Sequence, residues 1–304
     1  MSNTYTLNSI SQLHQSLGLP KPRHPLITVV YPDDVQPVIP LQDVKLIINL
    51  YQITLKQFAC GTLIYGRNSY DYEEGTIIFT SPGQVVAYKE GPEEDNQNIE
   101  GWSLCFHPDL IRKSDLGDKI NQYNFFNYEV NEALHLSDEE QKTIEEIVDK
   151  ITKEYCQNLD RHSQHLIVSN LELLLDYCLR YYDRQFYTRT NLNTDVVSKF
   201  ERLLKAYYQT NKTEKCSIPN VNYFGEKLNL SPYYLSDLLK KETGKSAQEH
   251  IHYHLIEKAK NKLLNSSDSV SSIGYDLGFE YPQHFSNLFK AKTGISPRAY
   301  RNLD

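Results

Sequence analysis

The stretch that decides the fold is residues 273–301, with the sequence IGYDLGFEYPQHFSNLFKAKTGISPRAYR. Part of this stretch repeats an earlier segment. Residues 221–228 align with residues 270–277 at an offset of 49, and residues 235–240 align with residues 285–290 at an offset of 50. One inserted residue between the two blocks accounts for the change of offset. Two copies are too few for a solenoid, so the repeat indicates a duplicated supersecondary unit.

Each copy has the pattern of a helix, a tight turn and a second helix. In the first copy, Val221, Phe224 and Leu228 recur at helical spacing. Asn229 follows them, and Gly278 takes the matching place in the second copy. Asparagine and glycine enter the left-handed backbone conformation more easily than other residues, so both positions predict a tight turn.

Proline marks the start of the second helix in each copy. Ser231-Pro232 predicts an N-cap followed by proline at the first helical position, whereas Tyr281-Pro282 has the proline but a poor cap. We therefore expect helix-turn-helix units at about 221–244 and 270–294. Residues 246–264 between them have an apolar face at helical spacing, which predicts a connecting helix that fixes the distance between the units.

Charge is distributed unevenly along the chain. The 304 residues carry a net charge of −7. Residues 195–304 contain 16 Lys and Arg against 12 Asp and Glu, a net charge of +4, which leaves −11 for the remainder. A basic segment joined to an acidic one indicates that only the C-terminal part meets a polyanion such as nucleic acid.

Composition also excludes several classes of protein. No apolar run is long enough to cross a membrane, and the first residues, MSNTY, have neither the basic nor the apolar region of a secretory signal. Five cysteines without a CxxC pair favour reduced thiols over a disulfide framework. We therefore expect a cytoplasmic protein without a membrane partner.

The N-terminal part has a strand pattern. Gly, Pro, Asp and Asn clusters separate six short β-rich runs, which span residues 26–31, 46–55, 62–65, 75–80, 84–88 and 102–106. Short strands at such regular spacing are typical of a barrel or a sandwich. Helical patterns follow at about 137–157 and 163–182, and the polar residues 188–194 are the expected linker.

Residues 273–301 resemble the signature of the AraC/XylS transcription regulators, a long pattern that includes the LGF, FK and SPRAYR elements of this chain. The resemblance covers about residues 196–304, and the first copy matches the family's other motif more loosely. Gly225 and Gly274 depart from the pattern, because the family usually has alanine at these close helix contacts. The resemblance implies a sequence-specific DNA-binding regulator that acts on the transcription machinery.

A second resemblance concerns residues 75–84, GTIIFTSPGQ, which look like the strand-turn-strand piece of cupin-like sensor domains. Metal-binding cupins have histidines just after such a turn, whereas Val85 and Val86 stand here, so we expect neither a metal nor another cofactor. The resemblance implies that residues 1–187 form a cupin-like β-barrel with trailing helices, which senses a small-molecule effector or forms a homodimer. The expected fold class is α+β, with residues 195–304 as an all-α double helix-turn-helix domain.

Outward-facing positions of the two second helices are the expected contacts with double-stranded DNA, because the second helix of such a unit lies in the major groove. The inward positions are Leu235, Leu238, Leu239, Phe285, Leu288 and Phe289. The expected base-reading residues are Tyr233, Tyr234, Ser236, Asp237, Gln283, His284, Ser286 and Asn287. Gln283 and Asn287 lead this set, because both amides pair bidentately with adenine. The expected phosphate contacts are Lys240, Lys241, Lys290, Lys292, Arg298 and Arg301.

Two enzyme classes remain as alternatives. A cupin-type metalloenzyme with an appended DNA-binding domain requires a cage of His and Glu on the strands, and the strand region offers only His107. A DNA-repair protein with a sacrificial cysteine requires a Cys activated by a neighbouring base or metal cluster. The scattered cysteines argue against the second class. His250 and His254 share a helix face, but no third metal ligand lies nearby, which argues against a metal site. We therefore expect that the chain is not an enzyme and has no catalytic residues.

Overall fold

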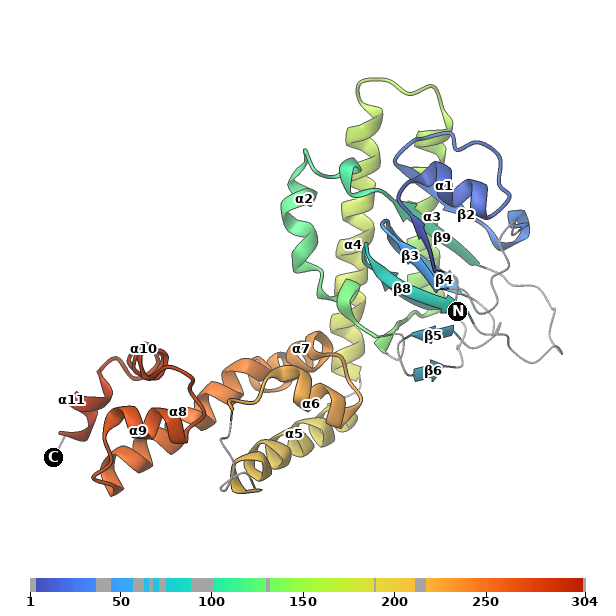
Figure 1. Ribbon diagram of the computed structural model, residues 1–304. Helices are drawn as coiled ribbons and strands as arrows, with labels where there is room; N and C mark the ends of the chain where they lie inside the picture. The colour runs from blue at the N-terminus through green and yellow to red at the C-terminus, as the bar shows by residue number, and fades with distance from the viewer. Residues whose placement is uncertain are drawn as a thin grey trace. The chain divides into compact units, whose positions relative to one another are not determined.

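The computed structural model of the chain describes residues 4–36, 45–56, 63–65, 68–70, 75–88, 101–129, 132–188, 190–210 and 217–302. The chain divides into two compact units, Met1–Thr188 and Arg189–Asp304. The first unit contains strands and helices, and the described residues of the second form helices (Figure 1). No helix in the described part of the chain is long and apolar enough to cross a membrane.

The described strands of the first unit form two five-stranded sheets. One sheet contains, in spatial order, β1 (Thr4–Leu7), β3 (Lys45–Ile48), β8 (Gln84–Tyr88), β5 (Leu63–Tyr65) and β6 (Asn68–Tyr70). The other contains β10 (Leu134–His135), β7 (Thr76–Thr80), β4 (Tyr51–Lys56), β9 (Gly101–Phe106) and β2 (Ile27–Val30). Strands β1 and β3 pair in parallel, and the other ladders are antiparallel.

The expected closed barrel is not confirmed, because no ladder between the described strands joins one sheet to the other. The prediction of a single strand at 46–55 is wrong: the run forms β3 and β4, which belong to different sheets. Between them the N–H of Asn49 donates to the carbonyl of Leu7 at 2.8 Å, which ties the bend to the end of β1. Strand β1 itself was not predicted.

Four α-helices accompany the described strands of the first unit. They are α1 (Ile10–Ser16), α2 (Asp115–Lys119), α3 (Asp138–Cys156) and α4 (Ser163–Thr188), with short 3-10 turns at Pro32–Asp34, Pro108–Leu110, Ile120–Gln122 and Asn124–Asn127. A capping box begins α3, in which Ser137 and Glu140 exchange hydrogen bonds. On β7, the ring of Phe79 packs on Phe125, Phe126 and Tyr182, so an aromatic cluster fills the space between this sheet and α4.

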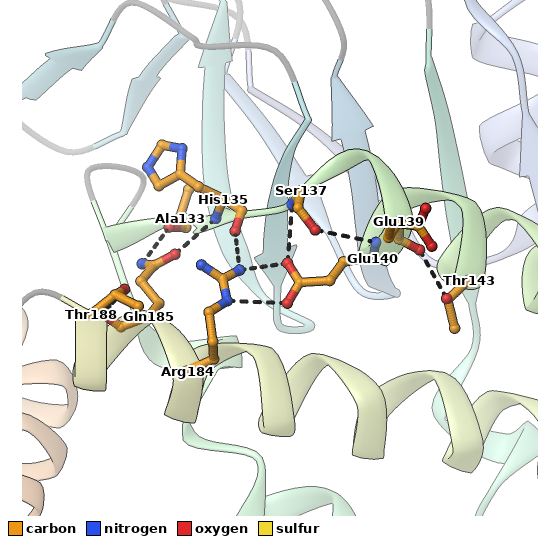
Figure 2. Close-up of polar contacts among 9 residues, drawn as sticks. All are labelled: Ala133, His135, Ser137, Glu139, Glu140, Thr143, Arg184, Gln185 and Thr188. Atoms are coloured by element: carbon orange, nitrogen blue, oxygen red, sulfur yellow. Dashed lines mark hydrogen bonds and ion pairs between the residues drawn. The ribbon is translucent and has the colours of Figure 1, made fainter.

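Two adjacent residues hold the end of α4 against β10 and the start of α3 (Figure 2). The buried amide of Gln185 donates to the carbonyl of Ala133 at 3.1 Å and accepts from the N–H of His135 at 2.9 Å. This side chain therefore takes the place of a neighbouring strand on one edge of β10. Arg184 makes two hydrogen bonds to the carboxylate of Glu140, at 3.0 and 2.6 Å, and a third to the carbonyl of His135 at 2.7 Å. The paired contacts fix the last turns of α4.

The second unit consists of α5 (Thr190–Thr210), α6 (Val221–Leu228), α7 (Pro232–Thr243), α8 (Ala247–Asn265), α9 (Val270–Asp276), α10 (Pro282–Thr293) and α11 (Pro297–Arg301). Helix α8 is the expected connecting helix. One apolar core joins these helices, from Phe200 of α5 through Leu255 of α8 to Phe289 of α10. The residues 190–194 expected in a linker form the first turn of α5 instead. Within that turn, the buried Asn193 donates its amide to Glu242 at 3.0 Å.

Candidate nucleic-acid interface

The first helix-turn-helix unit has the turn that its sequence predicts. Helix α6 ends at Asn229, whose φ of 55° is left-handed, and the N–H of Leu230 then donates to the carbonyl of Gly225 at 3.0 Å. Helix α7 follows at once, because the hydroxyl of Ser231 accepts from the N–H of Tyr234 at 3.1 Å and Pro232 occupies the first helical position. These contacts set the angle between the two helices within a few residues.

The second unit repeats the turn with a different residue. Gly278 has a φ of 93°, and the next residue, Phe279, donates its N–H to the carbonyl of Gly274 at 3.0 Å. Helix α10 starts with Tyr281 at the N-cap, and no side-chain hydrogen bond caps it. The expectation of a poor cap at Tyr281 is therefore confirmed. Both second helices end at a glycine with positive φ, Gly244 in α7 and Gly294 in α10.

Most of the expected base-reading side chains lie on the outer surfaces of α7 and α10. Four of them are exposed: Tyr233, Gln283, His284 and Asn287. Three are half-buried: Ser236, Asp237 and Ser286. Tyr234 is the exception, because it is only 6% exposed. It lies four residues before the buried Leu238, on the same face of α7, so this structure does not leave its ring open to a base edge.

The expected phosphate contacts also differ in exposure. The exposed ones are Lys240, Lys241, Lys290, Lys292 and Arg298. Arg301 differs, since its Nε donates to the carbonyl of Leu263 at 3.1 Å and its Nη2 is buried. This side chain binds the C-terminal end of α8 and holds α11 there, so the structure gives it a structural contact rather than an open cationic surface. Hydrogen bonds with Ser246 are the main cause of the lowered pKa of the Glu249 carboxyl, and the positive charges of Lys240 and Lys292 lower this pKa further.

The histidines of α8 pack within the second unit. Burial lowers the pKa of His250, His252 and His254, which favours their neutral forms. The ring of His250 lies 2.7 Å from the hydroxyl of Thr243. In the part of the chain that the structure describes, no three His, Cys, Asp or Glu residues are grouped so as to hold a metal ion.

A row of polar side chains in the first unit was missed by sequence reasoning. Gln52 and Thr54 of β4 lie beside Cys105 and Ser103 of β9: the amide of Gln52 is 3.6 Å from the Cys105 sulfur, and the hydroxyls of Thr54 and Ser103 are 2.9 Å apart. Cys105 packs against Leu46, Ile48 and other apolar residues of the sheet that contains β3, so the row faces that sheet. The alternation of polar and apolar residues at 52–55 is the signal that was available.

Cysteine reactivity follows from the same packing. Burial raises the pKa of the Cys105 thiol, and burial also raises the pKa of Cys178. Both residues are therefore thiols rather than thiolates at neutral pH, and a thiol is a weak nucleophile.

The second unit is similar in sequence to known proteins. A helix-turn-helix domain family matches residues 224–303. An uncharacterised HTH-type transcriptional regulator of Bacillus subtilis, YobQ, is 33% identical over 97 residues, which are 32% of this chain and 39% of that protein. The raffinose operon regulatory protein RafR of Pediococcus pentosaceus is 34% identical over 112 residues, 37% of this chain and 39% of that protein.

This chain therefore spans about two fifths of the length of these relatives. Among solved structures, the C-terminal domain of the response regulator yesN from Fusobacterium nucleatum is 30% identical, covers 34% of this chain and 97% of its own, and has a TM-score of 0.30. The repeated turns, the proline-led second helices and the sequence matches agree over the same residues. The C-terminal unit is a helix-turn-helix domain of the AraC type.

Proposed function

We propose that this chain is a sequence-specific transcription regulator that binds duplex DNA through its C-terminal unit and acts on the transcription machinery. One observation carries the proposal: a single core holds two helix-turn-helix units whose second helices expose polar side chains. The connecting helix α8 has 19 residues, a length of about 28 Å at 1.5 Å per residue. Successive major grooves on one face of DNA lie about 34 Å apart, so two adjacent grooves suit the two units.

The proposed base-reading residues are Tyr233, Ser236, Asp237, Gln283, His284, Ser286 and Asn287. Gln283 and Asn287 lie four residues apart on the exposed face of α10, where each amide is able to pair with an adenine. Asp237 holds the place in α7 that Asn287 holds in α10, and a carboxylate accepts a hydrogen bond from the amino group of cytosine. The two units therefore read different bases.

The proposed phosphate contacts are Lys240, Lys241, Lys290, Lys292 and Arg298. Each neutralised phosphate releases condensed counterions, so affinity falls as the salt concentration rises. Four to six such contacts in one chain correspond to a slope of about −4 to −5 in a plot of log affinity against log salt concentration.

Selection from a random duplex library with the full chain tests the proposal, since the enriched duplexes themselves reveal the preferred site. Asn287→Ala is expected to lose about 1–3 kcal/mol of discrimination at one or two base pairs of that site. Lys290→Ala is expected to weaken binding to all sequences alike and to make the salt slope shallower by about 0.9. A library that enriches no sequence contradicts the proposed function, and base preference that changes with Lys290→Ala but not with Asn287→Ala contradicts the assignment of roles.

Residues 1–187 are proposed as a cupin-like sensor and dimerisation domain, and residues 195–304 as the DNA-binding domain. The polar row of Gln52, Thr54 and Ser103 supports an effector site between the sheets, because these side chains offer hydrogen bonds in an otherwise apolar layer. A thermal-shift screen of small polar molecules against the full chain, repeated with Thr54→Val, tests this site. A molecule that stabilises both proteins equally binds elsewhere.

A homodimer through α4 is proposed from its exposed leucines. Leu166 and Leu173 are 44% and 42% exposed and lie seven residues apart on one face of the helix. Leu166→Asp combined with Leu173→Asp is expected to yield a monomer in sedimentation velocity at tens of micromolar. Leu179→Asp is the matched control, because that exposed leucine lies on another face of α4. A wild-type protein that sediments as a monomer contradicts the proposed dimer.

A further inference from the structure

The two second helices begin in different ways, although the units that contain them are copies. In α7 the N-cap is Ser231, which is 2% exposed and caps the helix with its hydroxyl. In α10 the N-cap is Tyr281, which makes no side-chain cap, and the N–H of His284 donates to the Tyr281 carbonyl at 3.0 Å instead. Since serine is a much better N-cap than tyrosine, Tyr281 weakens the helix start that it occupies.

The Tyr281 ring lies on the outer surface of the unit. It is 55% exposed and makes an edge-type contact with the ring of His284, with 5.4 Å between the centroids and an interplanar angle of 65°. His284 is exposed as well, whereas Tyr234, which holds the matching place in α7, is buried. Only the second unit therefore presents an aromatic pair at the start of its second helix, and this pair flanks the exposed Gln283.

We propose that Tyr281 contacts DNA: its phenol O–H donates to a backbone phosphate beside the bases that α10 reads, and its ring positions His284. The inference rests on the proposed function, because it requires α10 to lie in the major groove. Side chains at the start of the second helix are those that reach DNA in such a unit. Tyrosine hydroxyls are among the groups that bind phosphate oxygens and set the position of a protein on the duplex.

The location of Tyr281 favours phosphate over a base edge. The N-cap residue has an extended backbone, with φ −128° and ψ 124°, and precedes the helix proper. Gln283 and Asn287 lie further along α10 on its exposed face, where they are placed for base edges. A residue at the point where the chain enters the helix lies closer to the wall of the groove, which is formed by the sugar-phosphate backbone.

Tyr281→Ser separates this role from a merely structural one, because it restores the capping hydroxyl that Ser231 provides in α7. Hydrogen exchange of the amides in the first turn of α10 is expected to slow, since the helix start becomes more stable. Affinity of the full chain for its selected duplex is expected to fall about tenfold, the loss that corresponds to one hydrogen bond to a charged group. Stability and affinity thus change in opposite directions.

Tyr281→Phe isolates the hydroxyl, because it keeps the ring against His284. We expect it to weaken binding to the selected duplex and to an unrelated duplex by the same factor, with base preference unchanged. Tyr187→Phe is the matched control: Tyr187 is an exposed tyrosine of α4, outside the helix-turn-helix units, and this variant keeps the wild-type affinity. The double variant His284→Ala, Tyr281→Ser is expected to lose less binding free energy for the selected duplex than the two single variants lose together, since the Tyr281 ring acts through His284.

The outcomes are distinguishable. A wild-type chain that binds no duplex contradicts the proposed function and leaves Tyr281 without a role there. A wild-type chain that binds its selected duplex, together with Tyr281→Phe and Tyr281→Ser variants that bind it equally well, overturns the inference alone. A Tyr281→Phe variant that changes base preference overturns the phosphate contact.

Discussion

The two helix-turn-helix units show what the copies of a duplicated motif share and where they differ. Leu235 and Leu239 of α7 and Phe285 and Phe289 of α10 are all fully buried. The outer positions of the same helices differ in chemistry, with Asp237 in α7 at the place of Asn287 in α10. Positions that form the core and positions that face the solvent therefore lie on opposite faces of one helix, and the outer face varies without any change of fold.

The close contact between the helices also differs between the units. A Cβ added at Gly225 meets the backbone oxygen of Leu230 at 2.6 Å, whereas a Cβ added at Gly274 meets the ring of Phe285 at 3.3 Å. A backbone oxygen moves only if the turn changes shape, while a phenyl ring shifts by a few tenths of an ångström. The first turn is therefore the more tightly constrained of the two.

Phe285→Ala is expected to have the largest effect. Removal of a fully buried phenyl ring costs about 3–5 kcal/mol of unfolding free energy, because it loses apolar burial and leaves a cavity. The single tryptophan, Trp102, lies in the first unit, so its fluorescence reports that unit while far-UV circular dichroism also reports the helices of the second. We expect the loss of helical signal to begin at lower denaturant concentration while the Trp102 transition stays in place. The exposed Leu264→Ala is the control, expected within about 0.5 kcal/mol of wild type.

The pair Gly225→Ala and Gly274→Ala tests the difference between the turns. Overpacking costs about 1–3 kcal/mol, and alanine returns about 1 kcal/mol of helix propensity at either position. Gly225→Ala is therefore expected to destabilise the second unit, and Gly274→Ala to be neutral or slightly stabilising. Urea midpoints of the two variants provide the measurement. A lower midpoint for Gly274→Ala than for Gly225→Ala would show that the turns are constrained in the opposite order.

Ser231→Ala compares the two helix starts. Loss of the hydroxyl that accepts the Tyr234 N–H is expected to cost about 0.5–2 kcal/mol. Tyr281→Ala removes no cap and is expected to change stability by about 0.5 kcal/mol or less. Hydrogen exchange in the first turns of α7 and α10 measures the two effects separately. Equal acceleration in both helices would contradict the difference in capping.

The smallest expected effect is a pH dependence from α8. Burial lowers the pKa of His250, His252 and His254 below the ordinary value of 6.5, so between pH 6.5 and those lower values the unfolded chain binds more protons than the folded one. The contribution of these histidines to the free energy of unfolding is fully present above about pH 6.5 and is lost as the pH falls. Urea midpoints of the second unit at pH 7.5 and 6.0 measure the loss, and His252→Gln is expected to reduce it. A midpoint that rises on acidification contradicts the neutral state of these histidines.

Features of the second unit were predictable where their signals are local. Asn229 and Gly278 take left-handed conformations because the turn needs them there, and Ser231 caps α7 because its hydroxyl reaches an amide three residues ahead. The break of residues 46–55 into β3 and β4 was not predictable in this way. It depends on pairing with β8 on one side and with β7 and β9 on the other, across tens of residues.

By itself, the sequence determined the duplicated helix-turn-helix units, their turns and caps and most of their inward faces, because each of these depends on residues within one or two helical turns. Only the tertiary structure decided that Tyr234 is buried, that residues 190–194 continue into α5, and that Arg301 binds the carbonyl of Leu263, 38 residues earlier in the chain. These outcomes depend on which distant residues come together when the core forms, and a local pattern carries no information about that choice.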